Sequence, residues 1–213
     1  MIRREIMNNF LVLVPSEIEA EAIKELNLDM YIIGIGLVEA ILNSYKIFIE
    51  KKPKLVFLTG LAGAYPKSNL DIGNIVVATE EIWVDFGRKY KIHYTLPENL
   101  FNSNSVSFDK RWIKKTCSIL NECGLYSFSG PLATVCAASY DFQRAEFIEK
   151  KYHVLAENME GFGVAKVAFQ FNVNLIEIRI ISNLLSEPEK EWNFEKALFR
   201  LNETWKCLIN NWK

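Results

Sequence analysis

Glu157-Asn158-Met159-Glu160-Gly161 decides the predicted fold together with a second stretch, Arg179-Ile180-Ile181-Ser182-Asn183. Each follows a short apolar run typical of a buried strand: residues 154–156 precede the first and residues 175–178 precede the second. In an α/β sheet, functional groups collect beyond the carboxyl ends of parallel strands. We therefore expect the carboxylate of Glu160 and the amide of Asn183 to reach one small molecule.

Each of these motifs also has a simpler interpretation as an ordinary strand-to-helix turn. Glu160 would then favour a helix N-terminus by its charge, and Asn183 would serve as a turn residue. Either motif alone favours this simpler interpretation. The two motifs together, with the features described below, favour a functional site.

Strand-like and helix-like segments alternate along the whole chain. The expected strands cover residues 10–14, 30–35, 54–59, 75–86, 132–135, 154–156 and 175–182. The expected helices cover residues 17–26, 37–50, 109–122, 141–151, 161–171 and 192–212. This alternation predicts an α/β layered sheet. We expect one domain over residues 1–213, with residues 1–9 as an N-terminal overhang and residues 88–108 as a surface excursion over the site.

Composition excludes several classes of function. The chain has 213 residues, half of them hydrophobic, and a net charge of −1, so it has neither the charge nor a basic patch for a nucleic-acid partner. The apolar run at residues 10–14 is too short to cross a membrane. Two histidines rule out a His-rich metal site, and no cofactor motif is present. Four cysteines without metal-site spacing predict free thiols in a reducing cytoplasm.

Three turns near the expected strand ends carry further signals. Ser16 is predicted to cap the first helix, with Glu19 completing a capping box. Gly34-Ile35-Gly36 suits close approach of the backbone to a ligand but lacks the third glycine of a dinucleotide fingerprint. Gly60 to Gly63 predicts either a loop whose amides line a pocket or a tight turn.

Trp112, Trp192, Trp205 and Trp212 are interpreted as core or interface residues.

Glu19, Glu160 and Asn183 form the candidate catalytic set. No serine or cysteine nucleophile is evident beside them, and no metal cluster. Two carboxylates without a metal suit a reaction with an oxocarbenium-like transition state, as in glycosyl-bond cleavage. One carboxylate would take a proton from water, and the other would hold sugar hydroxyls by charge-assisted hydrogen bonds.

The same motifs carry a family resemblance. Residues 12–19, 34–40, 59–63, 72–77, 157–161 and 179–183 resemble the nucleoside phosphorylase and nucleosidase superfamily, in order and with similar spacing. The resemblance covers most of the chain and is weakest across residues 88–150. Its nearest branch is futalosine hydrolase, which releases hypoxanthine from futalosine in menaquinone biosynthesis. A near neighbour is methylthioadenosine/S-adenosylhomocysteine (MTA/SAH) nucleosidase.

The resemblance implies a three-layer α/β/α fold with a central twisted mixed sheet, a homodimer and a purine nucleoside substrate. It implies roles for single residues as well. Glu19 matches the water-activating carboxylate, and Met159 with Glu160 matches the pair under the ribose. Asn183 matches the residue that faces the purine. The remaining expected substrate contacts come from Leu61, Ala62, Gly63, Asn158 and Val135.

Asn183 and Asn158 depart from the adenine-specific nucleosidases, which carry Asp and Glu at these positions. An amide is no general acid, but it can donate to a 6-oxo group and accept an N–H from the purine. This pattern suits hypoxanthine. Two alternatives stay open: an adenine-releasing nucleosidase acting on MTA/SAH or aminodeoxyfutalosine, and a non-catalytic nucleoside-binding protein on the same scaffold.

The sequence favours hydrolysis over phosphorolysis. A phosphate dianion needs cations or a nest of amides, and no arginine lies between Glu5 and Gly87. The first strand-to-helix turn carries Glu17 and Glu19, which repel phosphate and suit a water molecule. Arg179 is interpreted as a buried ion pair or a sheet-end bond rather than as a phosphate ligand.

Overall fold

The computed structural model describes residues 10–89, 94–95 and 103–212. The expected N-terminal overhang lies outside the described residues, and so does most of the expected surface excursion. None of the helices in the described part is long and apolar enough to span a bilayer.

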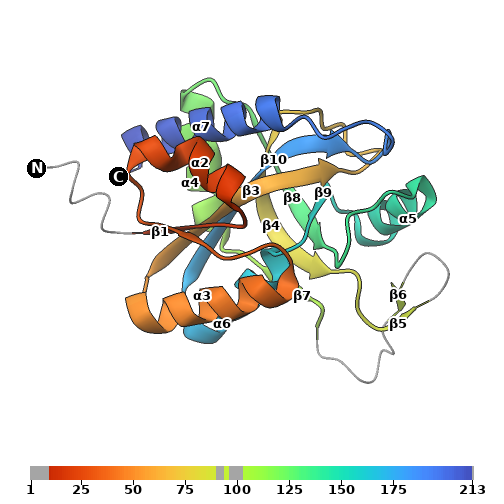
Figure 1. The fold of residues 1–213 in the computed structure, drawn as a ribbon, viewed down its shortest axis with the longest axis horizontal. Helices are drawn as coiled ribbons and strands as arrows, with labels where there is room; N and C mark the ends of the chain where they lie inside the picture. Colours follow the sequence, from red (N-terminus) through yellow and green to blue (C-terminus); the bar gives the residue numbers. More distant parts are fainter. Residues whose placement is uncertain (1–9, 90–93, 96–102, 213) are drawn as a thin grey trace, which may run out of the picture.

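The strands are β1 (Leu11–Val14), β2 (Met30–Ile32), β3 (Leu55–Ala64), β4 (Ile75–Trp83), β5 (Arg88–Lys89), β6 (Tyr94–Thr95), β7 (Ser105–Ser107), β8 (Ser127–Thr134), β9 (Ala156–Asn158) and β10 (Asn174–Leu184). The helices are α2 (Glu17–Ile23) with the 3-10 turn η1 (Lys24–Leu26), α3 (Leu37–Lys51), α4 (Lys110–Glu122), α5 (Phe142–Tyr152), α6 (Gly161–Phe171) and α7 (Phe194–Asn211). Helices α2, α4 and α7 cover one face of the sheet, and α3 and α6 cover the other (Figure 1). The predicted three-layer α/β/α fold is confirmed.

The central sheet is mixed. Its order is β10-β4-β8-β9-β3-β1-β2, and β7 pairs with β4. Strand β10 also pairs in parallel with β3, so β3, β10, β4, β8 and β9 form a closed ring of pairings. This closure brings the ends of β3, β9 and β10 together on one side of the molecule, where the site lies.

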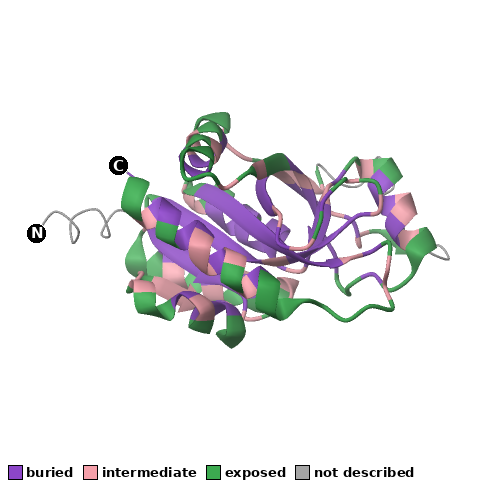
Figure 2. Cartoon of the chain, turned by 90° about the horizontal axis from the view of Figure 1, so that it is seen from above, coloured by how far each residue is buried: buried purple, intermediate pink, exposed green. Residues whose placement is uncertain are grey.

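Successive side chains of the inner strands point to opposite faces of the sheet, and this divides the core into two halves. Val12 and Val14 of β1 pack in the cluster that contains residues of α2 and α7. Leu11 and Leu13 point the other way and pack in the cluster that contains residues of α3 and α6. All four are buried, and Figure 2 shows the strands of the central sheet mostly in purple, the colour of buried residues. A strand buried on both faces reads as a continuous apolar run, which explains why residues 10–14 predicted a buried strand.

Three strands differ from the expectation in a way that matters for the site. Of the two alternatives for residues 60–63, the tight turn is wrong: β3 continues to Ala64 because its whole length pairs with β10, and Leu61 to Gly63 border the cavity. Strand β9 is only three residues long and runs antiparallel to β3, although parallel to β8. Asn183 lies inside β10 rather than beyond it. Tertiary pairing therefore overrides the local glycine signal in β3.

The prediction of four free cysteines is wrong for one pair. Cys123, after α4, and Cys207, in α7, form a disulfide although 84 positions separate them in the sequence. Helices α4 and α7 lie side by side, which no spacing rule could show (Figure 1). Cys117 and Cys136 remain free. The cysteine content thus supplies no argument for a reducing compartment.

Candidate active site

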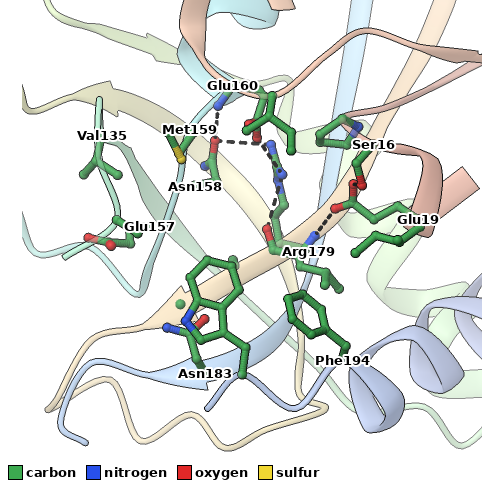
Figure 3. Close-up of a pocket in the computed structure, with 18 residues that line it drawn as sticks. Ser16, Glu19, Val135, Glu157, Asn158, Met159, Glu160, Arg179, Asn183 and Phe194 are labelled. Carbon is green, nitrogen blue, oxygen red and sulfur yellow. Dashed lines mark hydrogen bonds and ion pairs between the residues drawn. The ribbon is translucent and has the colours of Figure 1, made fainter. Parts of the chain in front are cut away.

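One cavity of about 250 Å³ opens where β3, β9 and β10 meet the first turns of α2 and α6 (Figure 3). All nine residues predicted for the site border it, although they come from distant parts of the chain. These residues are Glu19, Leu61, Ala62, Gly63, Val135, Asn158, Met159, Glu160 and Asn183. In Figure 3, Ser16 and Glu19 lie on one side of the cavity and Val135 on the other.

Glu19 is buried in the first two turns of α2, with both carboxylate oxygens engaged. Its Oε1 accepts a hydrogen bond from the Leu61 backbone N–H at 2.9 Å. Its Oε2 accepts one from the Ser16 hydroxyl at 2.6 Å. Ser16 does occupy the N-cap position, but its side chain makes no cap bond. The predicted capping box is therefore wrong: Ser16 orients the carboxylate of Glu19 instead of closing the helix.

Gly60 is required by the approach of Glu19 to the sheet. A Cβ atom at this position would lie 2.6 Å from Glu19 Oε1 and 3.0 Å from Arg179 Nη1. The first distance is too short for a side chain unless Glu19 moves, and the second is tight. The glycine therefore lets the carboxylate and the guanidinium converge over the backbone of β3.

Burial raises the pKa of Glu19 above its ordinary value, whereas the hydrogen bonds from Ser16 and Leu61 and the charge of Arg179 work to lower it. Burial is the largest of these influences. A carboxylate with a raised pKa is a stronger base than an exposed one, which suits the removal of a proton from water.

Glu160 lies at the N-cap of α6 and is also buried. Its Oε1 accepts a hydrogen bond from the Gly36 backbone N–H at 3.0 Å, and its Oε2 pairs with Arg179 Nη1 at 3.2 Å. The Gly34-Ile35-Gly36 turn thus approaches a protein carboxylate with its amide. The carboxylate is held from both sides and borders the cavity.

Arg179 is the only cationic residue among those that line the cavity in the described structure. Its side chain is 1 % exposed, and each of its three nitrogens donates to a protein oxygen. Nε donates to Glu177, Nη1 to Glu160 and to the Leu61 carbonyl, and Nη2 to Asn158. The interpretation as a buried ion pair agrees with this geometry.

Asn158 supports the turn that carries Glu160. Its Oδ1 accepts hydrogen bonds from the backbone N–H groups of Glu160 and Gly161 at 2.9 and 2.7 Å. Its Nδ2 donates to Glu81 at 2.6 Å. An amide can accept and donate at once, which a glutamate at this position could not do when ionised. Met159 follows it at the cavity wall.

Asn183 borders the opposite part of the cavity from Glu160. Its Oδ1 accepts a hydrogen bond from the Ser182 hydroxyl at 3.0 Å. This bond leaves Nδ2 as a donor, close to Gly63, where a Cβ atom would lie only 2.9 Å away. The local geometry therefore presents an amide donor beside the backbone of β3.

Sequence reasoning missed two aromatic side chains at the rim. Trp192, just before α7, and Phe194, the first residue of α7, border the cavity with their ring centroids 5.7 Å apart. The interpretation of Trp192 as a core or interface residue is corrected here: it is 44 % exposed and faces the cavity. The charged loop before it offered no periodic pattern, so only the fold could bring this pair to the site.

Glu157 was also missed as a cavity residue. It accepts hydrogen bonds from the backbone N–H and hydroxyl of Ser139, at 2.6 and 2.7 Å, and from the Tyr65 hydroxyl at 3.0 Å. Burial raises its pKa. These bonds fasten the segment after Val135 to β9, so Glu157 shapes the wall of the cavity through Ser139.

Within the described residues, no three His, Cys, Asp or Glu side chains are grouped so as to hold a metal ion. The side chains that border the cavity offer three buried carboxylates, those of Glu19, Glu157 and Glu160, together with an oriented amide and apolar walls. Such a set can hold a sugar, activate water and bond a heterocycle.

Comparisons with known proteins agree with this geometry. The profile of the phosphorylase superfamily matches residues 23–206. The MTA/SAH nucleosidase of Maridesulfovibrio salexigens is 30% identical over 79% of this chain and 73% of its own. The futalosine hydrolase of Acidothermus cellulolyticus is 27% identical over 86% of this chain and 76% of its own.

A solved structure shows the same fold. The futalosine hydrolase of Helicobacter pylori superposes with a TM-score of 0.81 at 20% identity, over 94% of this chain and 97% of that one. The relatives found by sequence are nucleosidases that cleave N-glycosidic bonds. This chain accordingly belongs to the phosphorylase superfamily and is an N-glycosyl hydrolase of the purine nucleosidase type.

Proposed function

We propose that this enzyme hydrolyses the N-glycosidic bond of futalosine and releases hypoxanthine, as a step of menaquinone biosynthesis in the cytoplasm. The supporting observation is the amide of Asn183 at the cavity, oriented by Ser182 so that Nδ2 is left to donate. The similarity to the futalosine hydrolase of A. cellulolyticus supports the same substrate.

The donor pattern of Asn183 favours a 6-oxo purine. Hypoxanthine offers the acceptors O6 and N7 on the edge that an amide N–H can meet, whereas adenine presents an amino donor at position 6. Leaving a buried polar group without its partner costs about 1–3 kcal/mol, a factor of ~5–150 in selectivity. We assign Asn183 to bond the departing base and to stabilise the charge that develops on it.

We assign the other groups by their positions. Glu19 takes a proton from the attacking water, and Glu160 with Met159 binds the ribose. Asn158 holds the turn of Glu160, while Leu61, Ala62, Gly63 and Val135 form the wall along the sugar and base. Among the cavity-lining residues, Arg179 is the one cation, and its charge is already paired with Glu160 and Glu177, which disfavours a phosphate dianion. This supports water as the acceptor.

An adenine-releasing nucleosidase is the second candidate. Its support is the similarity to the MTA/SAH nucleosidase of M. salexigens. The two candidates differ in the purine edge that they recognise, so a change at Asn183 separates them.

Purified enzyme should release hypoxanthine from futalosine without added phosphate, faster than it releases adenine from aminodeoxyfutalosine or methylthioadenosine. Asn183→Asp should shift the ratio of kcat/KM for the two purine types toward adenine by ~5–150-fold, because a carboxyl group pairs better with an amino donor. Asn174→Asp, an exposed change at the start of the same strand, is the control. Preferred release of adenine by the unchanged enzyme would reject futalosine as the substrate.

Glu19→Gln and Glu160→Gln should each lower kcat by about 10²-fold or more, because each removes a positioned base or an electrostatic group. Product release measured by chromatography checks this. Glu17→Gln, an exposed change in the same helix as Glu19, should leave kcat unchanged. Normal turnover in both active-site variants would place the chemistry elsewhere.

Ser16→Ala should move the acidic limb of the pH profile of kcat/KM upward by about one pH unit. The hydroxyl lowers the pKa of Glu19 by bonding its charged form, and a bond to a charged group contributes about 1.5 kcal/mol or more. At pH values above this acidic limb, kcat/KM should be close to that of the unchanged enzyme. Ser16→Thr should restore the profile, and an acidic limb that stays in place would exclude Glu19 as the titrating base.

We further propose that the enzyme is a homodimer in which a second copy covers α3. Val38, Leu42, Tyr45 and Ile49 form an apolar stripe on this helix, and each is about half exposed or more. Ile35, 62 % exposed, continues the stripe to the cavity rim. A second copy seated on this stripe would bury it and complete the wall of the site.

Light scattering should therefore give twice the chain mass for the unchanged enzyme, and Leu42→Glu should give a monomer with reduced activity. Phe199→Glu, on the exposed face of α7 in the opposite layer, is the matched control and should remain dimeric. A monomeric unchanged enzyme with full activity would overturn the dimer.

A further inference from the structure

Beneath Glu160 lies a second pair of acids, Glu81 on β4 and Glu177 on β10. Both side chains are completely buried. The two carboxyl groups meet at the first residue of α6: a Cβ atom at Gly161 would lie 2.2 Å from Glu81 Oε1 and 2.7 Å from Glu177 Oε1.

Each acid of this pair holds one of the groups that position Glu160. Glu81 accepts hydrogen bonds from Asn158 Nδ2 and from the Thr134 hydroxyl, both at 2.6 Å. Glu177 Oε1 accepts from Arg179 Nε at 2.8 Å. Asn158 then caps the turn of Glu160, and Arg179 pairs with its carboxylate. The acid pair is therefore connected to Glu160 through two different residues, Asn158 and Arg179.

The charges in this cluster do not balance if every group is ionised. Three buried carboxyls, those of Glu81, Glu160 and Glu177, meet a single guanidinium, that of Arg179. Two ionised carboxylates that meet in a buried site repel each other strongly, and a proton shared between them removes this repulsion. In addition, Glu177 Oε2 is buried without a hydrogen-bond partner in the described structure.

We propose that Glu81 and Glu177 share one proton in the active enzyme, and that this protonated pair is the positioning unit that holds Asn158 and Arg179 against Glu160. The proton lets the pair make its hydrogen bonds with only one negative charge, which Arg179 neutralises. Glu160 then keeps its own charge for the sugar. This last role, though not the shared proton itself, depends on the function proposed above.

The groups around the pair define how it responds to pH. Thr134 of β8, Asn158 of β9 and Arg179 of β10 contact it, Glu160 faces it from α6, and Glu19 of α2 lies near Arg179. Burial raises the pKa of both acids, that of Glu81 well above its ordinary value. The folded state thus keeps a proton that the unfolded chain releases above about pH 4.5. Stability from this proton is complete at low pH and is lost as the pH rises.

Glu81→Gln tests the proposal, because glutamine is a permanently neutral substitute for the protonated acid and can donate to Glu177. The melting temperature of the unchanged enzyme should fall between pH 5 and pH 9, and the fall should be smaller in Glu81→Gln. An equal fall in both would overturn the shared proton. This measurement needs no substrate, so it decides the matter even if futalosine is not hydrolysed.

Kinetics test the positioning role. With the substrate that the enzyme hydrolyses, the kcat of Glu81→Gln at pH 6 should lie within about 3-fold of that of the unchanged enzyme. The decline of kcat at alkaline pH that we expect for the unchanged enzyme should be absent in this variant. Glu81→Leu, which cannot bond Asn158, should lower kcat at least 10-fold. Glu149→Gln, a buried acid on α5 away from the cavity, should leave the alkaline limb in place. Equal kcat in the Gln and Leu variants, or an unchanged alkaline limb in Glu81→Gln, would reject the role.

Discussion

The buried guanidinium of Arg179 is the contact on which the rest of the site depends. It joins β10 to the carboxylate at the N-terminus of α6, to the amide of Asn158 and to the backbone of β3. A buried charge is tolerated only when its partners are present, and removing one partner costs about 3–5 kcal/mol. The position of Glu160 is therefore inseparable from the sheet that carries Arg179.

The same contact bears on the chemistry. Because protein oxygens occupy its donors, Arg179 organises carboxylates instead of offering a charge to an incoming anion. Across the cavity, Gly60 lets Glu19 approach the guanidinium without a side chain between them. The proposed function assigns the attacking water to Glu19, the sugar to Glu160 and the base to the amide of Asn183.

Local patterns predicted those parts of the chain whose structure depends on neighbours in sequence. Helix α6 was expected over residues 161–171 and has those bounds, because a continuous apolar face follows a strong N-terminal signal. The capping box predicted at Ser16 is wrong because the hydroxyl of Ser16 donates its hydrogen bond to the carboxylate of Glu19. The glycines at residues 60 and 63 left a tight turn open as an alternative, which the pairing of β3 with β10 excludes. The Cys123–Cys207 pair was not predicted because it joins segments that only packing brings together.

By itself, the sequence determined the alternating α/β order, the family motifs and the residue types of the site, because these depend on composition and on short-range periodicity. Only the tertiary structure decided that β9 runs antiparallel to β3, that Trp192 reaches the rim, and that Glu81 and Glu177 meet beneath α6. The physical reason is that such contacts join residues far apart in the chain. No local propensity encodes their distance, and burial then raises the pKa of the acids that meet.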